Sequence, residues 1–234
     1  MATGGRTGFG GQNGPVTRPM TGERDAVTAF ERAVAAMTAR RERRESTVIG
    51  DLPEAVTGVV LVEGASDSAA LHAAAELLGV DPAAEGVAIL PMGGAMSVRR
   101  FVDALAPSGV RLHGLCDEGE ADFFRRAGLG VDAISVCRPD LEGELLIALG
   151  DARAEAVLAR RGDLGLFRTF QRQPAQRARE VTAQLHRFFG TTSGRKELYG
   201  RLLTAELAAH ELPVPVREAL TALLCDPSTR ARLG

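Results

Sequence analysis

Four short apolar runs, each followed by a helical pattern, constrain the fold of this chain more than any other feature of its sequence. The runs lie at residues 57–62, 86–90, 111–116 and 132–138. Short runs that are apolar at nearly every position are typical of strands buried on both faces of a parallel sheet. The sequence therefore predicts an α/β fold, with a mainly parallel four-stranded sheet flanked by helices, over residues 55–150.

The segments on either side of this pattern differ from it. Residues 1–22 are rich in glycine and show no periodicity, so we expect a disordered tail. Apolar residues three or four apart predict a helical segment within residues 23–50. Residues 151–234 are expected to form a C-terminal helical extension packed on the sheet, with a loop between its first two helices. Its helical patterns lie at residues 151–161, 174–189, 196–210 and 213–224.

The charge and the cysteines exclude several classes of protein. The 28 basic and 30 acidic residues give a net charge of −2, so the whole chain does not attract nucleic acid, although arginines gather between Arg168 and Arg201. Three cysteines without CxxC spacing indicate neither a disulfide framework nor a zinc site. No apolar run approaches the about 18 residues of a membrane span, and no signal peptide is recognisable. We therefore expect a cytoplasmic protein that does not enter a membrane.

Carboxylates stand where the predicted strands end. Glu63 follows the first strand, Asp117 follows the third, and Asp140 and Glu142 follow the fourth. In parallel α/β sheets ligands bind at this edge, and two or three carboxylates suffice for a hard cation such as Mg²⁺. Asp67 lies one helical turn beyond Glu63 and can face the same point, although an acidic residue there also stabilises a helix N-terminus. The pattern predicts a divalent-metal site.

The order of five segments resembles the Toprim nuclease domain of the OLD (overcoming lysogenization defect) family. The segments are VEGASDSAAL, PMGGAMSVRRFVDAL, GLCDEGEADFFRRAGL, CRPDLEGELLIALG and GTTSGRKELYGRLL. The resemblance spans roughly residues 57–205 and implies a Toprim-like (Rossmann-like) sheet. OLD nucleases also carry an ATPase domain, but this sequence has no GxxxxGK[ST] loop. We therefore expect a stand-alone form, which leaves room for an ATPase partner on a separate chain.

The resemblance implies a metal-dependent endonuclease, a hydrolase that cleaves phosphodiester bonds of nucleic acid, with DNA as the expected substrate. It implies one or two Mg²⁺ or Mn²⁺ ions, a first held by Glu63, Asp67 and Asp117 and a second that Asp140 and Glu142 help to hold. Glu63 and Lys196 are the expected catalytic residues, with Lys196 offsetting negative charge in the transition state. The arginines expected to contact the nucleic-acid backbone are Arg168, Arg172, Arg177 and Arg195.

The sequence departs from the family pattern at its acidic motif. The usual motif is Asp-x-Asp, but Asp117 is followed by Glu118, Gly119 and Glu120, so glycine stands at the second aspartate position. Either Glu118 or Glu120 can supply the missing metal ligand. If neither does, the alternative is a non-catalytic Toprim-fold module, with a degraded metal site, that binds nucleic acid or regulates. The four histidines show no metal-ligand spacing, and we expect them to be surface or core residues.

Overall fold

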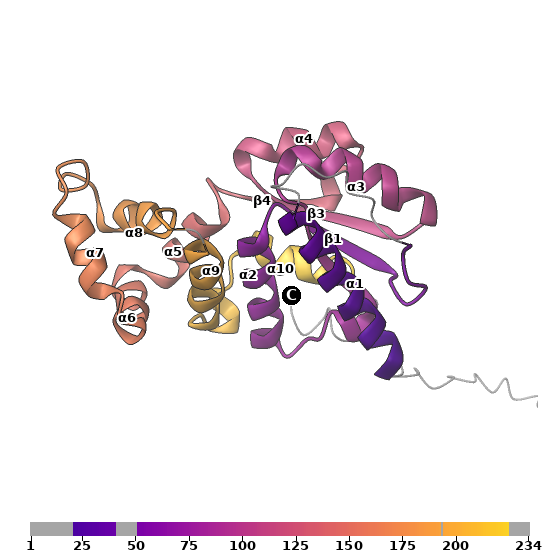
Figure 1. Ribbon diagram of the computed structural model, residues 1–234, viewed down its shortest axis with the longest axis horizontal. Helices are drawn as coiled ribbons and strands as arrows, with labels where there is room; N and C mark the ends of the chain where they lie inside the picture. Colours follow the sequence, from indigo (N-terminus) through magenta and orange to yellow (C-terminus); the bar gives the residue numbers. More distant parts are fainter. Residues whose placement is uncertain (1–20, 41–50, 193, 225–234) are drawn as a thin grey trace, which may run out of the picture.

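The four predicted strands form one parallel sheet in the order β2-β1-β3-β4 (Figure 1). The structure is a computed structural model that describes residues 21–40, 51–192 and 194–224. The strands are β1 (Gly58–Val62), β2 (Val87–Pro91), β3 (Arg111–Asp117) and β4 (Ile134–Cys137). Each begins and ends within two residues of its predicted run. The predicted parallel four-stranded sheet is confirmed.

Helices cover both faces of the sheet. Within β1 alternate residues face opposite ways: Val60 and Val62 join one apolar cluster, while Val59 and Leu61 join the other. Both faces are therefore buried, which explains why the strands are apolar at nearly every position. The helices on the Val60 face are α2 (Ala65–Leu78), α5 (Leu141–Leu149), α9 (Arg195–Ala205) and α10 (Val214–Thr221). Those on the Val59 face are α1 (Thr21–Arg40), α3 (Val98–Leu105) and α4 (Ala121–Ala127).

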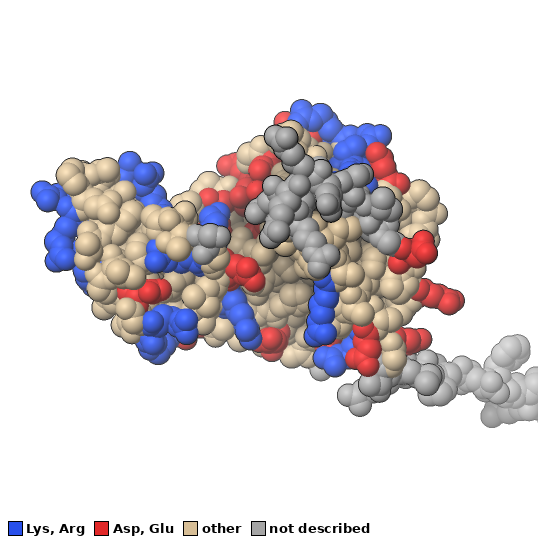
Figure 2. Space-filling model, in the orientation of Figure 1, with Lys and Arg blue, Asp and Glu red and all other residues tan. Residues whose placement is uncertain are grey.

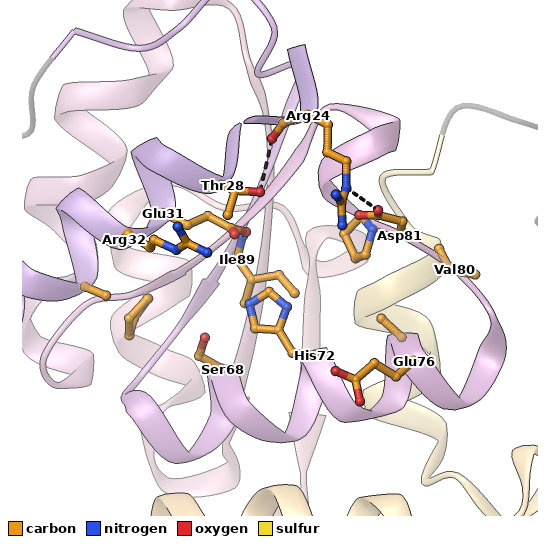
Figure 3. A pocket seen from close by; sticks show the side chains of 14 residues that line it. Arg24, Thr28, Glu31, Arg32, Ser68, His72, Glu76, Val80, Asp81 and Ile89 are labelled. Atoms are coloured by element: carbon orange, nitrogen blue, oxygen red, sulfur yellow. Dashed lines mark hydrogen bonds and ion pairs between the residues drawn. The ribbon is translucent and has the colours of Figure 1, made fainter. Parts of the chain in front are cut away.

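Helix α1 covers the outer edge of β2. Such an edge otherwise presents unpaired backbone groups, but the buried carboxylate of Glu31 accepts a hydrogen bond from the Ile89 backbone N–H at 2.6 Å. Figure 3 shows the Glu31 side chain extending from α1 toward Ile89, above a cavity that His72 of α2 also lines. This cavity has a volume of about 490 Å³. Burial raises the pKa of Glu31 to about 7, although the Ile89 N–H opposes the shift.

The predicted N-terminal helical segment is described only in part. Helix α1 begins at Thr21, two residues before the predicted start, and is described as far as Arg40. The predicted tail at residues 1–20 and the rest of the predicted helical segment, residues 41–50, lie outside the described residues. Among the helices of the described ranges, none combines the length and the apolar character needed to cross a bilayer.

Residues 151–189 form an arm that projects from the sheet in Figure 1. Its helices are α6 (Asp151–Arg161), α7 (Leu164–Gln171) and α8 (Val181–Phe189). The prediction of a loop before the second helix was wrong, because α7 occupies that segment. Phe167 and Phe170 of α7 place their rings 5.3 and 5.6 Å from the ring of Phe188. This packing between helices fixes a helix where local glycines favoured a loop.

The chain returns to the sheet after the arm. Helix α9 lies along α2, and Gly200 permits the approach, since a Cβ atom there would stand 3.0 Å from the carbonyl oxygen of Ser66. Helix α10 packs against β3 and β4. The Arg111 side chain of β3 also donates a hydrogen bond to the Leu223 carbonyl at 2.7 Å. The predicted C-terminal helical region is confirmed, and its last two helices contribute to the core of the sheet.

Candidate metal centre

The carboxyl ends of β1 and β3 meet at the middle of the sheet. Val62 lies beside Leu115 in the strand register, so Glu63 and Asp117 emerge from neighbouring strands. From β1 the chain moves outward to β2, and it later reaches β3 on the other side of β1. The strand order therefore reverses between β1 and β3, which is the position where open α/β sheets bind ligands.

A first group of carboxylates gathers at this position. One oxygen each of Glu63, Asp117 and Glu120 lies within 4.8 Å of the other two. Burial, with the charge of Asp140, raises the pKa of Asp117 to about 6. Burial and a hydrogen bond to Glu63 raise the pKa of Glu120 well above its ordinary value. These shifts show that the group favours protons, or another source of positive charge, between its carboxylates.

Asp67 joins this group from the first turn of α2. Its Oδ2 accepts a hydrogen bond from the Gly64 backbone N–H at 2.8 Å, so the side chain also caps its own helix. Burial raises the pKa of Asp67 to about 7; the Gly64 N–H opposes the shift, and the charges of Glu142 and Asp117 add to it. Asp67 is therefore close enough for its pKa to be raised by Asp117, at the end of β3, and by Glu142, which follows β4.

A second group stands beside the first. Ligand atoms of Asp140, Glu142 and His186 all lie within 4.8 Å of one another. Asp140 caps α5 by accepting a hydrogen bond from the Gly143 N–H at 2.8 Å, and its other oxygen lies 2.7 Å from His186 Nε2. Burial raises the pKa of Asp140, but the hydrogen bonds from His186 and Gly143 outweigh it, so the pKa falls below its ordinary value.

Asp117 links the two groups. Its Oδ1 accepts a hydrogen bond from the backbone N–H of Leu141, the first residue of α5, at 3.2 Å. The end of β3 is thereby tied to the helix that carries Glu142, and the two carboxylate groups form one centre.

Lys196 reaches this centre from α9. Its Nζ lies 3.2 Å from Glu142 Oε2, and the close contact of Gly200 with Ser66 holds this part of α9 against the start of α2. Burial lowers the pKa of Lys196, but the charge of Glu142 outweighs it, so the net shift is upward. The ammonium group therefore stays charged while half of its side chain is exposed.

Two oxygens of the centre have no hydrogen-bond partner among the described residues: Glu120 Oε2 and Glu142 Oε1, both buried. Glu142 is only 3% exposed. A buried carboxylate oxygen without a partner is costly, and a bound cation removes that cost. The carboxylate donors at both groups are those that Mg²⁺ or Mn²⁺ accepts. The residues of the centre therefore fit divalent metal ions.

A cavity of about 500 Å³ opens beside Glu63. The end of α1, including Thr38, lines one side, and the turn formed by Gly93 and Gly94 lines another. Both glycines have positive φ angles, 71° and 111°, and Gly94 N–H donates to the Glu63 carbonyl at 2.9 Å. The turn therefore fixes the end of β1 while keeping side chains out of the space next to Glu63.

The structure brings most of the predicted site residues together. Those that meet at the centre are Glu63, Asp67, Asp117, Glu120, Asp140, Glu142 and Lys196. Glu118 does not join them: its carboxylate is 58% exposed and lies 3.2 Å from the Arg138 guanidinium. His186 was expected to be a surface or core residue, but it contacts Asp140, from which 46 positions separate it. No local spacing in the sequence could have indicated that contact.

The four predicted nucleic-acid-binding arginines lie in different surroundings. Arg168 is paired with Glu155 through two nitrogens, at 2.8 and 2.6 Å. Arg195 lies over the Phe188 ring, 4.2 Å from its centroid. Arg172 and Arg177 are exposed and donate to a hydroxyl and a carbonyl of the arm. Figure 2 shows the Lys and Arg surface gathered over the arm at the left of the view.

The comparisons with known proteins agree with this geometry. The family described as Overcoming lysogenization defect protein-like, TOPRIM domain, matches residues 56–118. The C-terminal region of the Burkholderia pseudomallei OLD protein shares 14% identity at a TM-score of 0.55, covering 76% of this chain and 99% of that one. The C-terminal region of the Xanthomonas campestris pv. campestris OLD protein shares 22% identity at a TM-score of 0.51, covering 72% and 94%. No curated protein matches the chain.

At these sequence identities the solved structures establish only the fold. The family match covers β1, β2 and β3, with Glu63, Asp67 and Asp117. The two findings agree on one architecture, and the carboxylates stand at the strand ends where that architecture binds ligands. By its family match over residues 56–118 and by its fold, the chain thus resembles OLD-like Toprim proteins.

Proposed function

We propose that this protein is a divalent-metal-dependent nuclease that hydrolyses phosphodiester bonds of nucleic acid, with DNA as its substrate. An OLD-like Toprim domain points to a nuclease-type function. The observation that carries the proposal is the pair of adjoining carboxylate groups at the strand-order reversal, where two buried oxygens lack partners among the residues that the structure describes. A buried carboxylate oxygen without a hydrogen-bond partner costs free energy, and a bound cation would remove that cost.

The centre offers ligands for two ions, Mg²⁺ or Mn²⁺. The proposed ligands of the first ion are Glu63, Asp67, Asp117 and Glu120, and those of the second include Asp140 and Glu142. In this assignment Glu120, rather than Glu118, replaces the aspartate that is missing at Gly119. Bound ions would supply an activated water and would neutralise charge on the leaving oxygen of the phosphodiester.

Lys196 is proposed to act on the substrate phosphate. Its ammonium group stays charged against Glu142 and remains half exposed, so it can turn from the carboxylate to an incoming phosphate oxygen. A fixed positive charge there stabilises the negative charge that grows in the transition state.

The arm is proposed to hold the nucleic-acid backbone. Between residues 151 and 189 the sequence has eight arginines and four acidic residues, whereas the whole chain has a net charge of −2. Arg172 and Arg177 are the stronger candidates, since no described acidic side chain pairs with them. Arg168 would have to leave Glu155 first, and Arg195 would have to leave Phe188. Contacts of this kind make binding weaken steeply with salt.

One observation favours a second candidate function, a Toprim-fold module that binds nucleic acid without cutting it. Gly119 stands where the family pattern has its second aspartate, so the first group lacks one carboxylate. If Glu120 does not replace that ligand, the first ion is held weakly and cleavage is lost while the arm still binds. An ATPase partner on a separate chain and a cytoplasmic location stay predictions.

The test compares supercoiled plasmid incubated with the wild type, with Glu63→Gln and with Glu31→Gln, in Mn²⁺ or Mg²⁺. Glu31→Gln is the matched control, because it changes a buried carboxylate outside the centre. We expect nicking by the wild type, a loss of roughly 100-fold or more in Glu63→Gln, and a change within about twofold in the control. Equal rates in all three proteins would refute the assignment of Glu63. Retardation of the plasmid on a gel without nicking would favour the binding module.

A further inference from the structure

All four histidines lie within the described residues, and of these His186 alone reaches the carboxylate centre. His113 lies inside the sheet, 2.9 Å from Ser135, while His72 lines the cavity below Glu31 and His210 lies in the short 3₁₀ helix at Ala209–Glu211. The Nε2 atom of His186 stands 2.7 Å from Asp140 Oδ2 and within 4.8 Å of a Glu142 oxygen. An imidazole nitrogen therefore enters a group that otherwise offers only oxygen.

Glu142 supplies an independent reason to place a cation beside this nitrogen. Its side chain is almost completely buried, and its Oε2 is occupied by Lys196. Its Oε1 has no partner among the described residues. The Glu142 carboxylate and its neighbour Asp140 come from the start of α5, and the His186 ring comes from α8. One ligand atom of each lies within 4.8 Å of the other two.

We propose that His186 is a ligand of the second ion, together with Asp140 and Glu142, and that it makes this position select a transition-metal ion such as Mn²⁺ over Mg²⁺. The inference deepens the proposed function, because it rests on the second cation position of that centre. Imidazole nitrogen binds first-row transition metals well, whereas Mg²⁺ prefers oxygen ligands. A position with one nitrogen and two carboxylates therefore disfavours Mg²⁺ relative to Mn²⁺.

The change at His186 on binding balances in protons. Without the ion, a proton lies between Nε2 and Asp140 Oδ2 and holds the two side chains together. A metal ion needs the lone pair of Nε2, so it takes the place of that proton. The displaced proton moves to Nδ1 if that nitrogen is bare, and is released to solvent if Nδ1 already carries a hydrogen. Asp140 keeps its backbone hydrogen bond from Gly143 and stays oriented throughout.

The test is pulsed electron paramagnetic resonance of the full chain loaded with Mn²⁺, alongside equilibrium titrations with Mn²⁺ and with Mg²⁺. The variants are His186→Gln and the matched control His72→Gln. We expect a nitrogen coupling to Mn²⁺ in the wild type and in the control, and none in His186→Gln. Mn²⁺ affinity at one position should fall at least about tenfold in His186→Gln, with Mg²⁺ affinity changed less than about threefold.

A nitrogen coupling that persists in His186→Gln, or an unchanged Mn²⁺ affinity, would overturn the inference. If that variant does not fold, wild-type protein labelled with ¹⁵N only in histidine answers the same question, because the coupling must change to the ¹⁵N pattern. A histidine coupling in a protein that cleaves nothing would refute the nuclease and leave this inference standing. Cleavage by a protein that binds Mn²⁺ through oxygen alone would support the nuclease and refute the assignment of His186.

Discussion

Two regions of this molecule bury carboxylates against the same sheet: Glu31 at the outer edge of β2, and the carboxylate centre at the ends of β1 and β3. Burial raises the pKa of Glu31 to about 7, and it raises the pKa of Asp67 in the centre to about 7 as well. A raised pKa therefore does not separate the two regions.

The partners of the carboxylates separate them. Glu31 is one carboxylate facing a backbone N–H that would otherwise lack an acceptor, so it completes the fold. The centre has carboxylates from several elements facing one another, and two of their buried oxygens have no partner in the part of the chain that the structure describes. In the first arrangement the carboxylate and the N–H are partners within the fold, whereas the second has the form expected of a site that binds a ligand. Substitutions in the two regions should therefore have opposite consequences.

The largest expected difference is in cleavage rate, when a basic side chain beside each region is removed. Lys196→Ala should slow plasmid cleavage on the order of 100-fold, since it removes a positive charge from the transition state. Arg24→Ala, which breaks the exposed pair with Asp81 at the rim of the Glu31 cavity, should change the rate less than about twofold. The measurement is the initial nicking rate at saturating Mn²⁺. Similar losses in both variants would show that Lys196 has no special role.

A smaller effect is expected on stability at the edge of the sheet. Glu31→Ala leaves the Ile89 N–H buried without an acceptor, which should cost about 1–3 kcal/mol of the free energy of unfolding. Urea denaturation measures the loss, and Glu31→Gln, which keeps an acceptor oxygen, should recover most of it. If Glu31→Ala is as stable as the wild type, the hydrogen bond to the edge strand does not stabilise the fold.

The raised pKa values in both regions should make the stability of the protein depend on pH. The pKa values of Glu31 and Asp67 in the folded protein lie above their ordinary values, so the folded state holds more protons between about pH 4 and about pH 7. Stability is therefore lost as pH rises through that window, and the metal-free melting temperature should fall by roughly 5 °C between about pH 5 and about pH 8. Mn²⁺ should restore the part due to the centre.

The control for this experiment is Glu31→Gln, which should show a smaller fall with pH and the same gain from Mn²⁺. A melting temperature that rises with pH in the metal-free protein would contradict the direction of both shifts.

The smallest expected effect is a gain in stability, in contrast to the loss of stability expected for Glu31→Ala. Glu120→Gln removes one carboxylate from the crowded first group, so the metal-free protein should melt higher, on the order of 2 °C. The same variant should bind Mn²⁺ more weakly, because one ligand has lost its charge. A lower melting temperature, with unchanged Mn²⁺ affinity, would indicate that Glu120 is a structural residue like Glu31.

The sheet and the first half of the centre could be predicted from the sequence because they depend on local patterns. Each strand is buried on both faces, so its apolar run is visible, and Glu63 and Asp117 follow directly where two such runs end. Glu31, His186 and α7 could not be predicted in this way. Glu31 stands between Phe30 and Arg32 in an ordinary amphipathic helix, and its burial arises only because α1 covers β2. His186 meets Asp140 across 46 positions of sequence, and Phe167 meets Phe188 of the next helix. Both contacts form only when the helices pack.

The return of α9 to α2 has a consequence for how relatives of this chain can differ. Because both ends of the arm are anchored to the same body, by α5 before it and α9 after it, residues 151–189 form an insertion inside the fold. The entropy of closing such an insertion grows only with the logarithm of its length, about 0.6 kcal/mol for each doubling. Changes in the length of α6 and α7 are therefore compatible with an unchanged sheet and carboxylate centre, provided that α8 keeps His186 beside Asp140.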